Sequence, residues 1–244
     1  MRYTFVFIFL LCFSGFGLSQ GKIGPSVAIN NTWIYNANIL NAHRGLQYRF
    51  SYAPSFGISH VYLGDVLRYR VGVNYNGIEQ QLYAEYWHDF DQSFLSTTRI
   101  KMAEIPLYIG FENEHGFFFE MGLNAYYLLH AKEIIELEQA DAPITENELT
   151  FDFKRATFGF GSAIGKEFPN NLGGRLSISG EFQLGFSDIT KQSLSNGIFD
   201  SSFPNSFLNA MAHDGFEDVP QVTNYKTSSV FYIGVRVALL FPYD

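Results

Sequence analysis

Apolar and polar residues alternate along several long stretches of this chain. In the clearest stretch, 175–187, the even positions form an almost unbroken apolar series and the odd positions are polar or glycine. The even positions are Leu176, Ile178, Gly180, Phe182, Leu184 and Phe186. A period of two places successive side chains on opposite faces of an extended strand. This stretch therefore predicts a β-strand with one apolar face and one polar face.

The same pattern predicts seven further strands. Four are clear and begin near Leu67, Lys101, Phe117 and Phe231, while weaker ones occupy about 22–33, 46–58 and 153–168. The clear strands run for about ten to fourteen residues, against about five or six in most globular sheets. About ten tilted residues cross a bilayer as a barrel strand. The sequence thus predicts an all-β fold, an eight-stranded antiparallel up-and-down transmembrane β-barrel.

A soluble β-sandwich is the alternative, because its strands also alternate. The lengths of the connections favour the barrel. Long connections alternate with short ones along the chain. The long ones lie at about 34–45, 77–98, 131–151 and 189–228, and the short ones at 59–65, 113–116 and 169–174. Bacterial barrels have longer outer loops and short periplasmic turns. We therefore predict one barrel domain over 21–244, with long outer loops at about 77–98, 131–151 and 189–228.

The N-terminal segment is typical of a signal peptide. Arg2 precedes an apolar run over 5–11, and the small or polar residues over 14–20 suit cleavage after Ser19 or Gln20. The apolar run is short for a membrane anchor, and no later run approaches the length of a transmembrane helix. We expect residues 1–20 to be a cleaved signal peptide and the protein to reside in the outer membrane of a Gram-negative envelope.

Composition excludes several classes of partner and site. The chain carries 16 Lys and Arg against 24 Asp and Glu, a formal net charge of −8, and has no basic cluster. Because phosphate backbones require a basic footprint, no nucleic-acid partner is expected. Cys12 is the only cysteine, which excludes disulfide frameworks and cysteine-ligated zinc. The partners that remain are outer-membrane lipid and another envelope protein, reached through the outer loops.

Charged residues on the predicted inner face are the first candidate site residues. An eight-stranded barrel has an interior just wide enough for side chains to fill it. Buried charges there must pair to offset the loss of hydration. We therefore expect a structural polar network that plugs the lumen; the alternative is a gated pore or narrow channel. The residues are Arg49, Arg68, Arg70, Glu104, Glu120, Arg155, Arg175, Glu181 and Arg236.

The predicted outer loops carry the remaining candidates. His88, Asp89 and His213 could supply acid and base groups to a protease or lipid-A hydrolase active at the outer rim. No serine–histidine motif accompanies them, and the acidic runs lack the spacing of a calcium loop. We therefore expect a non-enzymatic protein with no catalytic residue, no cofactor and no metal. Apolar residues in the last loop predict a partner-binding surface: Phe199, Phe203, Phe207, Leu208, Met211 and Phe216.

The C-terminal two-thirds resembles a known family. Segment 99–110 (RIKMAEIPLYIG) is similar to the strand with an Ile-Pro pair in the outer-membrane β-barrel domain of Bacteroidota, often called PorT-like. Segments 121–127, 158–165 and 184–189 and a last strand ending at Phe241 follow in that family's order. Three residues follow Phe241, whereas the family usually ends on this aromatic residue. The resemblance implies a barrel that binds or assembles with envelope partners, and some members are linked to gliding motility and type IX secretion.

Overall fold

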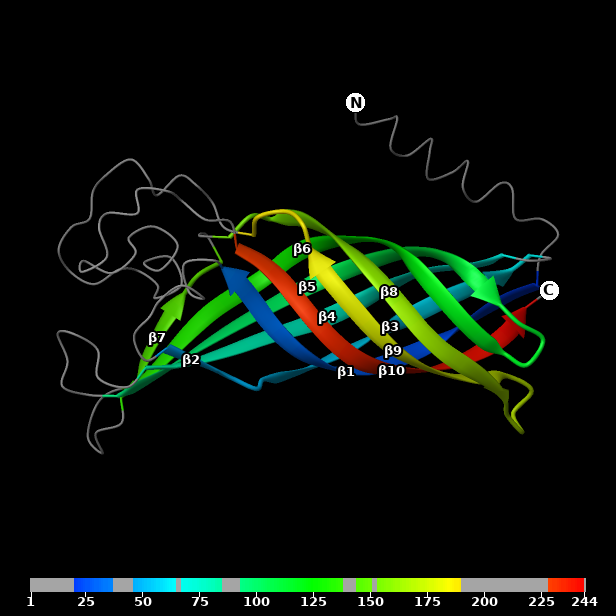
Figure 1. Ribbon diagram of the computed structural model, residues 1–244, viewed down its shortest axis with the longest axis horizontal. Coiled ribbons are helices and arrows are strands. Elements are labelled where there is room, and N and C mark those ends of the chain that lie inside the picture. The colour runs from blue at the N-terminus through cyan, green and yellow to red at the C-terminus, as the bar shows by residue number, and fades with distance from the viewer. Residues whose placement is uncertain are drawn as a thin grey trace, which may run out of the picture.

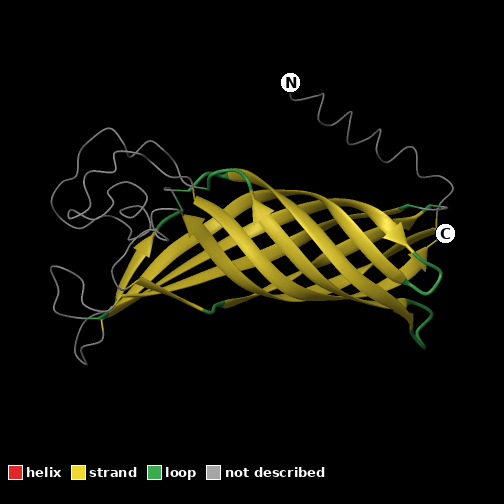
Figure 2. Ribbon diagram, in the orientation of Figure 1, coloured by secondary structure: helices red, strands yellow, loops and turns green. Residues whose placement is uncertain are grey.

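The computed structural model describes residues 20–36, 46–64, 67–84, 93–137, 144–150, 153–189 and 228–243. These residues form strands and short turns (Figure 2). The strands are β1 (Gln20–Asn36), β2 (Leu46–Arg49), β3 (Tyr52–Leu63), β4 (Arg68–Ala84), β5 (Phe94–Glu112), β6 (Phe117–Leu137), β7 (Thr145–Glu148), β8 (Ala156–Pro169), β9 (Arg175–Gly185) and β10 (Ser228–Tyr243). No helix among the described residues has the length and apolar character needed to cross a membrane.

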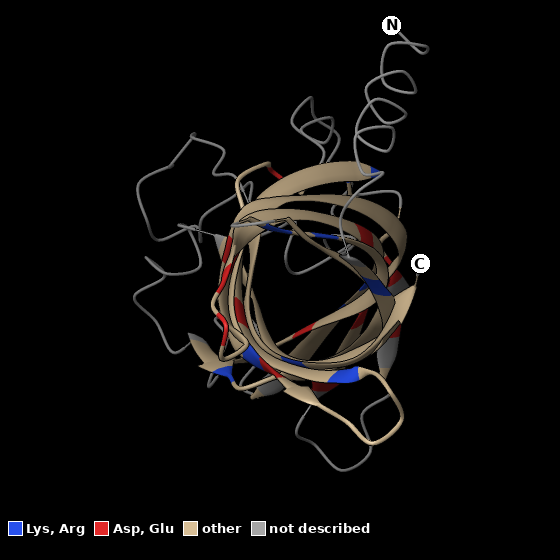
Figure 3. Ribbon diagram, turned by 90° about the vertical axis from the view of Figure 1, so that its right-hand side faces the viewer, with Lys and Arg blue, Asp and Glu red and all other residues tan. Residues whose placement is uncertain are grey.

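Eight of these strands close into a ring. Each long strand pairs antiparallel with the next, in the order β1, β3, β4, β5, β6, β8, β9 and β10, and β10 pairs back with β1. The two four-residue strands, β2 and β7, pair with β4 and β6 outside this ring. Figure 1 shows the long tilted barrel that results, and Figure 3 shows the ring from one end. The predicted all-β, eight-stranded antiparallel fold is confirmed.

The two faces of the ring have opposite character. The outer face is apolar: Leu123 is 56% exposed, and its cross-strand neighbours Leu107 and Phe160 are exposed too. The inner face holds the buried polar side chains, among them Glu104 and Glu120, which are fully buried. In water this arrangement would be unstable, but hydrocarbon is a suitable solvent for the outer face. The described strands therefore form a transmembrane barrel.

Short turns and both ends of the described chain lie at one end of the barrel, here called the turn end (Figure 1). In the turn after β5, the side-chain oxygen of Asn113 accepts hydrogen bonds from the backbone N–H groups of His115 and Phe117. Gly116 has a φ of 78°, a conformation that favours glycine. Asn170 caps the turn after β8 in the same way. These turns match the predicted connections at 113–116 and 169–174.

At the opposite end, here called the loop end, the strands run further than predicted. β4 continues to Ala84, β5 begins at Phe94, and β6 continues to Leu137, so much of the predicted loops at 77–98 and 131–151 is strand. The pattern changes there: Glu79 and Gln81 lie on the outer face of β4, while Ile78 and Leu82 are buried inside. Outside the bilayer, water replaces lipid, so the apolar residues turn inward. This inversion conceals the strands from a search for an apolar outer face.

An irregularity in β6 also changes which of its residues face inward near the loop end. The register with β5 shifts between Lys101 and Met102, so that Leu128 and His130 face successive residues of β5 and Leu129 is left over. A β-bulge of this kind moves the following side chains to the other face. Ala131 and Glu133 are consequently buried, although even positions face inward in the first part of β6.

The predicted strand over 46–58 is divided in two. β2 ends at Arg49 and β3 begins at Tyr52, and the two pair with different parts of β4. The predicted signal peptide lies outside the described residues except for Gln20, the first residue of β1. Most of the predicted loop at 189–228 also lies outside them.

Leu123 provides a test of the outer face. It is the seventh residue of β6, which places it about 14 Å above the turn end, near the middle of an apolar band about 25 Å tall. Leu123→Arg should therefore lower the free energy of unfolding by about 2–4 kcal/mol. Urea-induced unfolding of the barrel in liposomes measures the change.

Leu172→Arg is the matched control, because Leu172 lies in the turn after β8 and is 73% exposed. This substitution should cost less than about 1 kcal/mol, since the new charge stays at the interface. Equal stability of Leu123→Arg and the wild type would mean that Leu123 faces the lumen and not the lipid.

Candidate functional site

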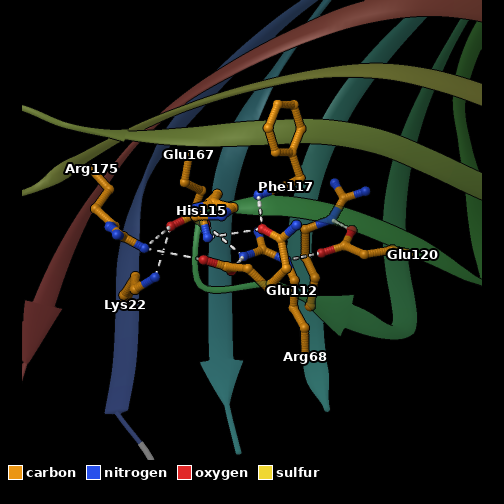
Figure 4. Close-up of polar contacts among 10 residues, drawn as sticks. Lys22, Arg68, Glu112, His115, Phe117, Glu120, Glu167 and Arg175 are labelled. Carbon is orange, nitrogen blue, oxygen red and sulfur yellow. Dashed lines mark hydrogen bonds and ion pairs between the residues drawn. The ribbon is translucent and has the colours of Figure 1, made fainter. Parts of the chain in front are cut away.

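A cluster of charged side chains fills the lumen near the turn end, with Arg68 of β4 at its centre (Figure 4). The Arg68 guanidinium binds three carboxylates: Glu120 through Nε, and Glu112 and Glu167 through Nη1, the last at 2.6 Å. Its carbon Cζ lies 4.1 Å from the centre of the Phe118 ring. Three carboxylates and an aromatic face together replace the water that this buried cation has lost.

Two further cations extend the cluster toward the turn end. The Lys22 ammonium of β1 donates a hydrogen bond to Glu167 at 2.7 Å. Arg175 of β9 lies 3.1 Å from Glu112 and 3.5 Å from Glu167. Glu112 is thus paired with two cations and Glu167 with three, each from a different strand, and Figure 4 shows these side chains converging.

The cluster continues toward the middle of the barrel through Arg70. Its Nε donates to Glu120 at 2.6 Å, and its Nη1 lies 2.8 Å from Glu181. Arg236 of β10 approaches the same Glu181 oxygen with Nε at 2.9 Å. Arg70 also lies over the Tyr108 ring at 4.5 Å. Gly161 leaves the space that the Tyr108 hydroxyl fills, since a Cβ there would collide with it.

A layer of neutral polar side chains around one carboxylate follows. The Glu104 carboxylate accepts hydrogen bonds from Asn74 at 3.0 Å, Asn76 at 2.6 Å and the Tyr232 hydroxyl at 3.3 Å. Above it, toward the loop end, the lumen is closed by apolar side chains, which include Ile34, Ile78, Leu82, Ile100, Met102, Leu128, Leu149, Phe153 and Ile189. The lumen is therefore charged near the turn end and apolar near the loop end.

Seven of the nine residues predicted for the inner face line the lumen: Arg68, Arg70, Glu104, Glu120, Arg175, Glu181 and Arg236. The prediction is wrong for Arg49 and Arg155, which are exposed. Arg49 is the last residue of β2, where the strand breaks, and it lies over the Tyr83 ring at 4.5 Å. Arg155 precedes β8. Alternation fixes the facing of a side chain only within a continuous strand, so it does not apply to these two.

Sequence reasoning missed Lys22, Glu112 and Glu167. The signal was present: Glu112 shares the parity of Glu104 on β5, and Glu167 shares the parity of Arg155 within the predicted strand 153–168. Each lies within two residues of a strand end or a turn. Side chains at that depth look solvent-exposed in sequence, but here they point inward and are buried.

A second group of titratable residues lies at the loop end, where β7 meets β6. The Thr150 hydroxyl donates to Glu148, and His130 Nδ1 lies 3.3 Å from Glu148 and 3.4 Å from Thr150. The hydrogen bond from Thr150 lowers the pKa of the Glu148 carboxyl. Both oxygen groups face the same ring nitrogen, whereas a catalytic triad needs them on opposite nitrogens. This group therefore anchors β7 to β6.

His88, Asp89 and His213, and the apolar residues Phe199, Phe203, Phe207, Leu208, Met211 and Phe216, lie outside the described residues. Within the described ranges, no three His, Cys, Asp or Glu side chains are grouped so as to hold a metal ion.

Glu120 tests the interpretation of the cluster as a dry ion-pair network. Glu120→Gln keeps the size of the side chain but leaves Arg68 and Arg70 without a shared carboxylate. Breaking a buried pair costs about 3–5 kcal/mol, and urea-induced unfolding in detergent micelles should show a loss of that order.

Arg99→Gln is the control, since Arg99 pairs with Glu79 at 2.8 Å and its side chain is 48% exposed. An exposed pair of this kind is worth less than about 1 kcal/mol. If both substitutions had equally small effects, water would reach the Glu120 site and the lumen would be hydrated.

Comparisons of the chain with known proteins found similar solved structures but no sequence match. No protein-family model and no curated protein matches the sequence. Neisserial surface protein A is similar over 90% of this chain and 96% of its own, at 10% identity and a TM-score of 0.34. Ail of Yersinia pestis, in complex with the heparin analogue sucrose octasulfate, is similar over 91% of this chain and 99% of its own, at 11% identity and a TM-score of 0.37. The outer membrane protein OprG of Pseudomonas aeruginosa is similar over 90% of this chain and 95% of its own, at 12% identity and a TM-score of 0.32. The strand pairing of the chain itself shows that its fold is a closed, eight-stranded antiparallel β-barrel.

Proposed function

We propose that this protein is a non-conducting, non-enzymatic outer-membrane barrel that carries a partner-binding surface at its loop end. The observation that supports this most is the packing of the lumen. Ion-paired side chains fill the part near the turn end, and apolar side chains fill the part near the loop end. A path for ions would have to pass both layers. With the interior occupied, the surfaces beyond the membrane are where a partner would bind.

The sheet that rises from the loop end supports a binding role. At the loop end, the paired strands β2, β4, β5, β6 and β7 form a sheet that continues beyond the membrane-spanning part of the ring. The outer face of this sheet carries charges of both signs, with ion pairs between Arg99 and Glu79 at 2.8 Å and between Lys132 and Glu146 at 2.6 Å. A sheet whose polar outer face is exposed to water is accessible to a protein partner outside the membrane.

The resemblance to PorT-like barrels gives the proposed partner a class. It rests on the Ile105-Pro106 strand and the glycine-rich strands that follow it. On this basis the partner is another protein of a Bacteroidota envelope, within a secretion or envelope-maintenance assembly. The proposed location requires residues 1–20 to act as a cleaved signal peptide.

Planar-bilayer recording tests the non-conducting lumen. Wild-type protein should show no sustained ion current, because a conducting path would need the ion pairs of Arg68 and the apolar layer to open together. Gel mobility of the protein recovered from the bilayer sample, compared before and after boiling, serves as the control that the barrel is folded. A steady, ion-selective current from the wild type would mean that the lumen is a conduit.

Photo-crosslinking in intact cells tests the location of the binding surface. A benzophenone amino acid at Arg99 or at Ile144, which is 69% exposed, should form adducts with one defined envelope protein. The matched control places the same group at Leu172, on the turn end. Adducts from Leu172 but from neither loop-end position would contradict the proposal.

A further inference from the structure

One lysine lies on the lipid-facing side of the barrel near the turn end. Lys166 of β8 pairs across the strands with Phe117, the first residue of β6, and with Ile178 of β9. Its neighbour Glu167 is buried in the lumen, so the side chain of Lys166 points outward, and it is half-buried there. Because β6 begins at the turn end, Lys166 lies at the edge of the apolar band, where the lipid headgroups begin.

Two aromatic rings hold the ammonium group of Lys166 against the barrel wall. Its Nζ lies 4.3 Å from the centre of the Phe117 ring and 5.2 Å from the centre of the Phe168 ring. Both rings are exposed on the outer face. Aromatic faces attract a cation without neutralising it. These contacts therefore fix the position of a positive charge and leave that charge uncompensated.

No carboxylate in the described part of the chain pairs with Lys166. The other cations near the turn end, Lys22, Arg68 and Arg175, all bind carboxylates inside the lumen. An ammonium group carries three N–H donors, and that of Lys166 donates to no residue that the structure describes. The partner that fits this group is a negatively charged acceptor from outside the protein.

The lipid-facing surface next to Lys166 suits an acyl chain. Ile164 precedes Lys166 by two residues on the same face of β8 and is 68% exposed. Gly180 of β9 pairs with Ile164, and a Cβ added to this glycine would meet nothing within 4 Å. The surface therefore has open space at Gly180, beside the exposed side chains of Ile164 and Ile178. An acyl chain that runs from Lys166 toward the middle of the bilayer passes along these residues and packs against them.

We infer that Lys166, Phe117 and Phe168 form a binding site for an anionic phospholipid in the leaflet at the turn end. The ammonium group donates hydrogen bonds to the lipid phosphate, and an acyl chain packs against Ile164 and over Gly180. A zwitterionic lipid binds less well, because its own ammonium group repels Lys166. The site lies at the opposite end of the barrel from the proposed protein-binding surface, and it does not depend on that proposal.

Native mass spectrometry of the full folded barrel tests this site. The protein in detergent is mixed with equal amounts of phosphatidylglycerol and phosphatidylcholine that carry identical acyl chains. The wild type should retain phosphatidylglycerol about fivefold better, which is the effect of one cation on an anionic lipid at a membrane surface. Lys166→Gln should remove this preference. Lys166→Arg should keep it, since a guanidinium group retains the charge and stacks on aromatic rings.

Lys101 supplies the control, because it is an exposed lysine of β5 that contacts no described ring or carboxylate. Lys101→Gln should keep the full preference for phosphatidylglycerol. Phe168→Leu removes one ring but remains apolar, and it should weaken the preference. An unchanged preference in Lys166→Gln or in Phe168→Leu, or an equal loss in Lys101→Gln, would overturn the inference.

Inorganic phosphate distinguishes a lipid site from a site for the free ion. At constant ionic strength, replacing chloride by phosphate should leave phosphatidylglycerol bound to the wild type, because the acyl chain contributes to binding and the free ion lacks one. Displacement of the lipid by phosphate would mean that Lys166 recognises the ion alone, and the inferred lipid site would be wrong.

Discussion

The loss of hydration inside a narrow ring governs which side chains the inner face can hold. An eight-stranded barrel has room for side chains but little room for water. A guanidinium group in that space is stable only when carboxylates and aromatic faces replace its water shell. Arg68 illustrates the requirement, since it contacts three carboxylates and the Phe118 ring. Lys22, Glu112 and Glu167 therefore belong to the same unit as Arg68, although they are far apart in sequence.

The solvent outside the barrel decides what each strand shows on its two faces. β4 illustrates both regimes, since Val73 faces lipid opposite buried Asn74, whereas Glu79 faces water opposite buried Ile78. The polar lumen and the apolar layer above it thus have one cause. Where the outside is lipid, the polar side chains are inside. Where the outside is water, apolar side chains such as Ile78 and Leu82 are inside too, beside buried polar ones such as Gln80. The point of inversion marks the upper edge of the membrane-spanning part of β4.

Period-two alternation was sufficient to predict the class of the fold, the eight strands and the facing of residues such as Arg70, Glu120 and Glu181. It failed where a strand is interrupted, as at Arg49 and Arg155, and where the bulge after Leu128 reverses the facing of β6. It could not predict which charges meet. That depends on the tilt and stagger of the closed ring, which bring Arg68 of β4 against Glu167 of β8. No local pattern of the sequence contains this information.

The ion pairs that cross the lumen have a consequence for how the ring closes. Arg70 of β4 reaches Glu181 of β9, and Lys22 of β1 reaches Glu167 of β8, although neither pair of strands is adjacent in the ring. Such contacts form only when every strand between them has its native register. A slip by one residue would turn Arg70 toward lipid and Val71 toward the lumen, which exchanges a buried ion pair for a charge in hydrocarbon. The hydrogen bonds of a sheet tolerate such a slip, because the backbone repeats. The crossing ion pairs do not tolerate it, so the network that fills the lumen also specifies the register of the strands around it.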